Sequence, residues 1–402
     1  MARSRSESND HSSVPGVDKA RAVKLVMEMM AIPGKSGHEG AISAFIIEKL
    51  RQAGVPDSCI TRDTAHKKSE LGGECGNLIV KLPGTLPGPR RLLMAHIDTV
   101  PLCVGAKPKK QGEFIVSADQ STALGGDNRA GAAVVLQSIL TLLEKQTPHP
   151  PLTLFWPVQE EVGLVGARHV GLSKLGGPKF CFNWDGGSPQ MAVIGATGAD
   201  HLDIDIQGIA SHAGAHPEVG VSAAVIAGVA IADLQQNGWH GLVVKGKEAG
   251  TSNIGSLHGG EATNVVLERL QLTAEVRSHN PKFRQKIVTA YQQAFTKAAK
   301  QVQSSKGATG SVTIKVRDKY ESFRLPESEP VVQMAMQAIT AHGLVPETRV
   351  VNGGLDANWM TRHGLSTVTL GCGQDGIHTV NETLHIESFL HACQIALHLA
   401  VG

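Results

Sequence analysis

The sequence predicts an α/β protein in which a small domain is inserted into a larger one. Strand-like and helix-like segments alternate in the first half of the chain and again at its end, and the segments between them follow the order βαββαβ. The 402 residues, 41% of them hydrophobic, are enough to bury a sizeable core. We expect a larger domain of residues 18–195 and 321–402, built on a mostly parallel central sheet flanked by helices, and an inserted domain of residues 196–320. Residues 1–17, which lack an apolar run, are expected to be a disordered tail.

The elements of the larger domain follow from hydrophobic periodicity and turn residues. Apolar residues at Val23, Val26, Met27 and Met30 predict a first helix that ends at Pro33. The other predicted elements are a helix over residues 39–53, strands over 77–80 and 91–96, an apolar helix over 131–143, and strands over 152–156 and 366–370. Strands that alternate with helices in this way favour parallel pairing.

The inserted domain has a different residue pattern, in which polar and apolar residues alternate along the predicted strands. Its predicted elements are a strand over residues 201–207, a helix over 221–236, strands near 251–258 and 268–278, a helix after Pro281, and a strand over 311–318. We expect one sheet with two helices packed on it.

Composition excludes several classes of protein. The 38 basic and 36 acidic residues nearly cancel, which leaves no electrostatic footprint for binding nucleic acid or a membrane surface. The six cysteines are scattered without a Cys-x-x-Cys pair, as in a reduced cytosolic protein. No apolar run is long enough to span a membrane. We therefore expect a cytoplasmic protein without nucleic-acid or membrane partners.

The first candidate site lies at the end of the predicted strand 91–96. Alternation along a strand places His96 and Asp98 on the same face. A histidine that binds a metal usually has a carboxylate that orients its ring, and Asp98 is placed to supply one. Without a metal, the same pair would be a simple His–Asp hydrogen bond, and both interpretations remain open at this point.

Acidic residues follow at two further positions. Asp127 precedes the apolar helix 131–143, where it can cap the helix, bridge two metal ions, or do both. Glu160 and Glu161 follow the strand 152–156, and adjacent carboxylates point to different sides. One of them can bind a metal while its neighbour acts as a base, although a solvated pair of glutamates is the alternative.

Asp185 and His378 complete the set of possible ligands. Each of the five candidates comes after a strand of the larger domain; they are His96, Asp127, Glu161, Asp185 and His378. Five such ligands suit two metal ions that share one carboxylate. Imidazole and carboxylate groups together favour zinc or a similar divalent ion, such as cobalt or manganese.

The order of these motifs resembles the co-catalytic zinc exopeptidases, metallopeptidase family 20. The motifs are His-x-Asp-Thr-Val at 96–100, Gly-Asp-Asn-Arg-Ala-Gly at 126–131, Glu-Glu-Val-Gly at 160–163, Asp185, and His378 followed by Asn-Glu. The resemblance extends from about Val17 to Gly402. Residues 124–127 and 353–358 are most similar to the peptidase T-like branch, the tripeptide aminopeptidases. Asn128 and Arg129, where that branch commonly has Asp-Lys, and Leu267, in place of a frequent proline, depart from its pattern.

The resemblance implies a role for each candidate in the larger domain. His96 and Asp185 would bind one metal ion, Glu161 and His378 the other, and Asp127 would bridge them. Asp98 would orient His96, and Glu160 would be the general base and acid.

The resemblance also implies that the inserted domain is a ferredoxin-like lid that forms dimers. His212, within Ser-His-Ala-Gly-Ala-His-Pro, would stabilise the oxyanion, in some relatives from the partner subunit. Asn264 and Arg277 would hold a substrate carboxylate, and we expect Arg277 on the polar face of its strand to be free to reach a ligand. A solvated arginine is the alternative.

Three functions are compatible with these residues. The first is a di-zinc exopeptidase for short peptides that removes the N-terminal residue of tripeptides. The second is an amidohydrolase of the same architecture that cleaves N-acyl or N-carbamoyl bonds in small amides. The third, an inactive metal-binding relative, is disfavoured because Glu160 is present beside Glu161.

Overall fold

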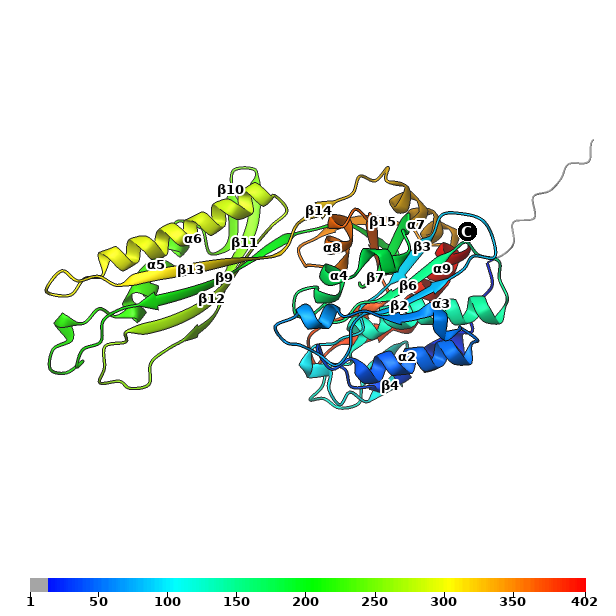
Figure 1. Cartoon of the computed structure of the whole chain (residues 1–402), viewed down its shortest axis with the longest axis horizontal. Coiled ribbons are helices and arrows are strands. Elements are labelled where there is room, and N and C mark those ends of the chain that lie inside the picture. Colours follow the sequence, from blue (N-terminus) through cyan, green and yellow to red (C-terminus); the bar gives the residue numbers. More distant parts are fainter. Residues whose placement is uncertain (1–13) are drawn as a thin grey trace, which may run out of the picture. The chain divides into compact units, whose positions relative to one another are not determined.

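The computed structural model describes residues 14–402, which form two compact units (Figure 1). The first unit takes in the described residues up to Val193, together with Pro326–Thr348 and His363–Gly402. The second unit consists of Ile194–Leu325 and Arg349–Arg362. Residues 1–13 of the expected disordered tail lie outside the described residues. In the remainder of that segment, Gln394 forms hydrogen bonds with the backbone of Pro15 and Val17.

The second unit is made of one long segment of the chain and one short one. The chain enters the second unit at Ile194 and leaves it at Leu325, but residues 349–362 also belong to it. The side chain of Asn358 explains this return, since its Nδ2 donates to the carbonyls of Thr197 (3.0 Å) and Glu321 (2.8 Å). Such long-range backbone contacts leave no local pattern in the sequence.

The first unit is built on a sheet in the order β1-β2-β6-β3-β7-β16-β8. The four central strands β6, β3, β7 and β16 run parallel, while the flanking strands are antiparallel to their neighbours. This confirms the predicted mostly parallel sheet. The bounds of the strands are β1 Ile60–Arg62, β2 Leu78–Leu82, β3 Arg91–Met94, β6 Leu152–Trp156, β7 Phe180–Trp184, β8 Met191–Ala196 and β16 Thr367–Leu370.

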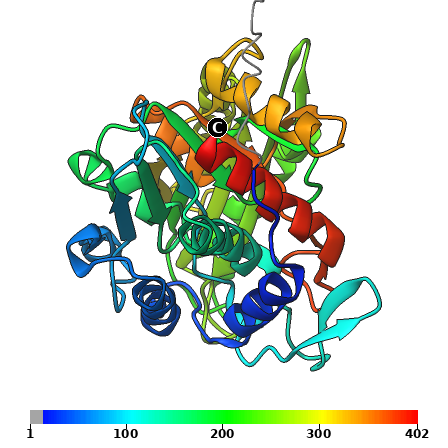
Figure 2. The same cartoon turned by 90° about the vertical axis from the view of Figure 1, so that its right-hand side faces the viewer.

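Helices cover this sheet, as predicted. The helix α3 (Gly126–Glu144) is buried along nearly its whole length because it packs against the sheet and against α1 (Lys19–Ala31) and α9 (Ile386–Val401). Figure 2 shows α9 in red, with α3 and α1 beside it. The other α-helices of the unit are α2 Gly40–Gln52, α4 Val165–His169 and α7 Pro330–Ala341. Within residues 14–402, no helix combines the length and the apolar character needed to cross a membrane.

The first unit also contains a small antiparallel sheet that was not predicted from the sequence. Its order is β17-β18-β5-β4, with bounds β4 Pro108–Gln111, β5 Phe114–Ser117, β17 Gln374–Asp375 and β18 Thr383–His385. Single turns of 3₁₀-helix occur at Asp57–Cys59, Ala65–Lys68, Pro101–Cys103 and Leu172–Leu175.

The second unit is an antiparallel sheet in the order β10-β11-β12-β9-β13, with two helices packed on one face. Its elements are β9 Gly198–Gln207, α5 Ala223–Gln236, β10 Gly241–Lys245, β11 Glu248–His258, β12 Arg269–Ser278, α6 Pro281–Gln301 and β13 Ser311–Tyr320. The predicted order βαββαβ lacked β10. In this short edge strand Val243 is buried between exposed Leu242 and Val244, but all three residues are apolar, so the sequence shows no alternation of polar and apolar residues there.

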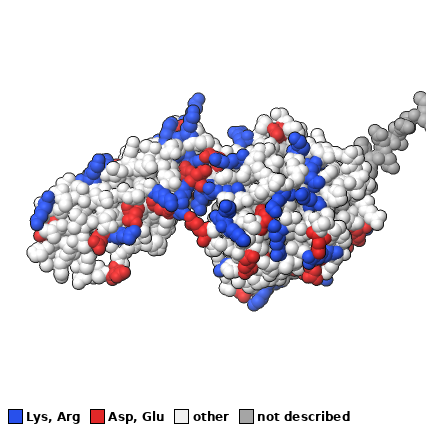
Figure 3. All heavy atoms as spheres, in the orientation of Figure 1, with Lys and Arg blue, Asp and Glu red and all other residues white. Residues whose placement is uncertain are grey.

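The face of this sheet that lies away from the helices is polar. Arg269 pairs with Asp205 at 2.7 Å, and Arg317 pairs with Asp203 at 2.8 Å. Figure 3 shows basic and acidic side chains interspersed on the surface of this unit.

The second unit has three further elements: a single turn of 3₁₀-helix at Pro217–Val219, the strand β14 Phe323–Arg324 and the helix α8 Asp356–Arg362. The strand β14 pairs with the end of β8. The strand β15 Glu347–Val351 begins in the first unit and ends in the second.

Candidate metal centre

The candidate site lies where the parallel strands of the first unit end. His96 follows β3, Glu160 and Glu161 follow β6, and Asp185 follows β7 directly. Because β6, β3 and β7 are parallel neighbours, their carboxyl ends meet at one edge of the sheet, where ligands of α/β proteins bind. Asp127 arrives at the start of α3.

The two oxygen atoms of Asp127 face two different histidines. Oδ1 lies 3.3 Å from Nε2 of His96, and Oδ2 lies 3.2 Å from Nε2 of His378. Glu161 Oε2 is 3.0 Å from the same nitrogen of His378, and Asp185 Oδ1 is 3.9 Å from that of His96. The structure therefore brings all five predicted ligands together.

Two overlapping groups of these residues have the geometry to hold a metal ion. Ligand atoms of His96, Asp127 and Glu161 lie within 4.8 Å of one another, as do those of His96, Glu160 and Asp185. The second group includes Glu160, which was predicted from the sequence only as a base. Its Oε2 lies 4.0 Å from His96 Nε2, so it borders the ligands closely.

The donor set fits divalent cations. Carboxylates outnumber imidazoles, and the Oδ1 atom of Asp127 is buried without a well-aligned hydrogen-bond donor among the described residues, although the His96 ring lies nearby. Burying several anions together is costly unless cations compensate their charge. Mixed imidazole and carboxylate ligands are typical of zinc and similar metals.

The excess of carboxylates raises the pKa values of several of these residues. Burial and the charge of Asp127 raise the pKa of Asp185 to about 7, and burial also raises the pKa of Glu161. Hydrogen bonds to Asp127 and Glu161 raise the pKa of His378 to about 10. Burial opposes a charge on His96, but the neighbouring carboxylates of Asp127 and Asp98 raise its pKa well above the ordinary value. Divalent cations would replace these protons.

Asp98 contacts both His96 and the turn that carries the two glutamates. Its Oδ1 lies 3.3 Å from Nδ1 of His96 and accepts the backbone N–H of Glu160 at 3.0 Å. Its Oδ2 accepts the N–H of Glu161 at 3.2 Å and the hydroxyl of Ser36 at 2.7 Å. Burial opposes the charge of Asp98, but the hydrogen bond to His96 keeps its pKa low. Of these contacts, only the one with His96 was predicted from the sequence.

Two further buried carboxylates support the site and were assigned no role from the sequence. Glu39 accepts the backbone N–H of Gln159 at 3.2 Å, beside the turn with Glu160. Glu382 accepts the backbone N–H of Asp127 at 2.8 Å. The Asn-Glu pair after His378 was noted as part of a motif, but no local pattern shows which backbone groups a glutamate reaches.

His212 and Asn264 lie on neighbouring segments of the second unit, and both are exposed. The N–H of Ala213 donates to the carbonyl of Asn264 at 2.9 Å. The Nδ1 of His212 accepts the N–H groups of Gly214 and Ala215 at 3.1 and 3.0 Å. In a neutral ring the proton is therefore on Nε2, which is left as a donor.

Arg277 is not free, in contrast to the expectation from its strand position. Its guanidinium forms two hydrogen bonds with Glu275, at 3.0 and 3.1 Å, and donates to the carbonyl of Asn352 at 3.4 Å. Glu275 lies two residues before it on β12, so both side chains share one face of the sheet. A substrate carboxylate would have to compete with Glu275 for this arginine.

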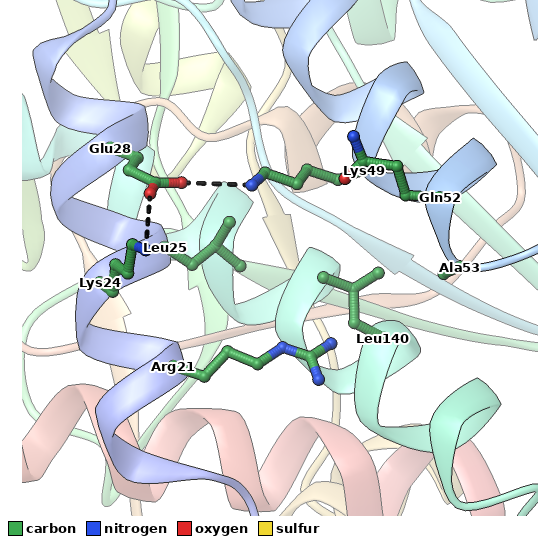
Figure 4. A pocket seen from close by; sticks show the side chains of 8 residues that line it. All are labelled: Arg21, Lys24, Leu25, Glu28, Lys49, Gln52, Ala53 and Leu140. Carbon is green, nitrogen blue, oxygen red and sulfur yellow. Dashed lines mark ion pairs between the residues drawn. The ribbon is translucent and has the colours of Figure 1, made fainter.

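A surface cavity of about 310 Å³ lies between α1, α2 and α3 and includes none of the predicted site residues (Figure 4). Both lysines at this cavity form ion pairs with Glu28. Its Oε1 lies 3.8 Å from Nζ of Lys24, and its Oε2 lies 3.3 Å from Nζ of Lys49. Arg21, also at this cavity, pairs with Glu144. The cations that line the cavity thus have acidic partners already, which distinguishes it from the candidate metal centre.

Comparisons with known proteins found matches over most of the chain. Residues 92–401 match the model of peptidase family M20/M25/M40. The uncharacterized protein YqjE of Bacillus subtilis is 30% identical over 382 residues, which cover 95% of this chain and 98% of that protein.

Two solved structures are similar over 96% of this chain and 98% of theirs. Aminopeptidase PepT from Bacillus cereus is 31% identical with a TM-score of 0.81. A tripeptidase from Staphylococcus aureus is 30% identical with a TM-score of 0.85. These matches confirm the resemblance inferred from the motifs.

Proposed function

The chain belongs to peptidase family M20/M25/M40, and we propose that it is a two-metal aminopeptidase that removes the N-terminal residue of short peptides, tripeptides above all. Family membership makes the chain a hydrolase. The observation that carries the two-metal proposal is that one oxygen of Asp127 lies beside His96 and the other beside His378. The peptide substrate is supported by the similarity to an aminopeptidase and a tripeptidase.

We assign the metal ligands as the motifs imply. His96 and Asp185 would hold one ion, Glu161 and His378 the other, and Asp127 would bridge them, with zinc favoured by the donor set. Two divalent cations supply Lewis acidity: they polarise a scissile carbonyl and lower the pKa of water toward about 7.

Glu160 would move the proton. Asp98 accepts a hydrogen bond from the backbone N–H of Glu160. The Oε2 atom of Glu160 lies next to the ligand atoms, at 4.0 Å from Nε2 of His96. From this position the carboxylate would take a proton from the attacking water and deliver it to the leaving amine. Removing such a base typically lowers the rate by about 10²–10⁴-fold.

The second unit would contribute to substrate binding as a lid. His212 would donate from Nε2 to the oxyanion, in its own subunit or across a dimer, because Nδ1 is occupied by backbone donors. Asn264 and Arg277 would bind the substrate carboxylate, with Arg277 exchanging Glu275 for it.

The test is an assay of zinc-loaded protein against tripeptides, dipeptides, N-acyl amino acids and N-carbamoyl compounds. Wild type should release the first residue of tripeptides but not of N-acetylated ones. Glu160→Ala should lose this activity while binding the same amount of zinc, and Glu48→Gln on α2 should retain it. Cleavage of N-acyl or N-carbamoyl compounds alone would replace the proposal with the amidohydrolase alternative. Equal inactivity of wild type and Glu160→Ala on all substrates would indicate an inactive metal-binding relative.

A further inference from the structure

Glu382 is a buried carboxylate outside the proposed ligand set. It lies four residues after His378, immediately before β18, and only 2% of its surface is exposed. A charged group in such a place needs hydrogen-bond donors that repay its desolvation.

Both donors come from the loop that carries Asp127. Oε2 of Glu382 accepts the N–H of Gly125 at 2.7 Å, and Oε1 accepts the N–H of Asp127 at 2.8 Å. Both carboxylate oxygens thus bind backbone amides, and Gly125 and Asp127 lie on either side of Gly126. A Cβ atom at Gly126 would lie 3.1 Å from Oε1, so the glycine permits this close approach.

We propose that Glu382 is a positioning residue that fixes the orientation of Asp127 toward both metal ions. This inference rests on the proposed two-metal centre. A bridging carboxylate must present one oxygen to each ion, so its backbone has to be held in one direction. Glu382 can hold the backbone in this direction because its carboxylate binds the backbone N–H of Asp127 itself.

Glutamine is an informative replacement for Glu382. It has the same shape but only one acceptor oxygen, and its NH₂ group would face a backbone N–H. Glu382→Gln therefore loses one of the two hydrogen bonds and places two donors against each other. The loop at Gly125–Asp127 should then tilt, and with it the carboxylate of Asp127.

Asp63 provides a matched control for a merely structural effect. It is also buried in the first unit, and its Oδ1 accepts the backbone N–H groups of Ala65 and Asn77 at 2.9 Å each. None of these residues belongs to the proposed centre. Asp63→Asn should lower stability without changing the metal ligands.

The experiment uses the full chain, stripped of metal and titrated with zinc against a chromophoric chelator, and with cobalt for its visible spectrum. For Glu382→Gln we expect at least about tenfold weaker binding of one zinc ion, as is typical when a residue supporting a ligand is changed. We also expect a changed cobalt spectrum and a lower kcat with little change in KM. Asp63→Asn should keep the wild-type affinity and spectrum.

The inference is overturned if Glu382→Gln retains the wild-type zinc affinity and cobalt spectrum, or if Asp63→Asn alters both equally. If Glu382→Gln does not fold, Gly126→Ala serves in its place, since its added methyl group displaces the same carboxylate more gently. With that variant, an unchanged spectrum again refutes the inference. Failure of the wild type to bind two metal ions would instead overturn the proposed function, and this inference with it.

Discussion

The stability of the metal-free protein should depend on pH through Glu39, and replacing this residue should remove that dependence. Glu39 is fully buried, and its Oε1 accepts the N–H groups of Gly37 at 2.8 Å and Gln159 at 3.2 Å. Its other oxygen, Oε2, is buried without a hydrogen-bond partner among the described residues. Glutamine can therefore replace Glu39 with its carbonyl oxygen in the Oε1 position.

The magnitude follows from the pKa of Glu39. Burial, assisted by the charge of Asp98, raises this pKa from 4.5 to about 7. Between these values the unfolded chain releases the proton while the folded protein still holds it, so stability falls as the pH rises. At about 1.4 kcal/mol for each pH unit, ionised Glu39 costs the folded state about 3 kcal/mol above pH 7. Below pH 4.5 both states are protonated and the cost vanishes.

The assay is urea denaturation of wild type and Glu39→Gln at several values between pH 5 and 8, with a chelator present throughout. The difference between the two proteins isolates Glu39, because every other titrating group is shared. As the pH rises, the free energy of unfolding of the variant should increase relative to that of the wild type, by up to about 3 kcal/mol. A difference that stays constant with pH, or grows in the opposite direction, would refute the reasoning.

Two further predictions concern the metal ions and a close backbone contact. Chelation should lower the midpoint of thermal unfolding, and zinc should restore it. Zinc at a free concentration of 100 times its Kd adds about 2.7 kcal/mol per site to the free energy of unfolding. An unchanged midpoint would contradict the two-metal proposal. Gly131→Ala should destabilise the protein by about 2 kcal/mol or more and lower zinc binding, because the new Cβ would lie only 2.1 Å from the carbonyl oxygen of Trp184, next to Asp185. Gly228→Ala on α5, where nothing lies within 4 Å, should instead be neutral or stabilising; similar losses in both variants would show that the contact does not matter.

The ligands could be predicted because their positions follow from strand geometry. Residues after parallel neighbouring strands must meet at one edge of a sheet, so His96, Glu161 and Asp185 converge even though they are far apart in the chain. Alternation along the strand likewise predicted that Asp98 lies beside His96. These inferences need only the period of a strand and the order of the motifs.

The supporting groups could not be predicted, because they act on backbone atoms. Glu382 and Asp127 are separated by 255 residues, and a backbone N–H carries no signature in the sequence. The pairing of Arg277 with Glu275 was within reach, since the spacing of two residues on a strand places them on one face. The edge strand β10 was missed because it is short and only its central valine is buried.

The place of β16 in the sheet has a consequence for synthesis on the ribosome. This strand lies between β7 and β8, which follow each other closely in the chain, yet it is made only when residues 367–370 emerge. Until then the facing edges of β7 and β8 have no strand between them, and such open edges invite pairing with other chains. A product truncated before β16 would also lack His378 and should aggregate rather than persist as a partly active fragment. The facing edges of β7 and β8 therefore remain unpaired with β16 until residues 367–370 have been translated.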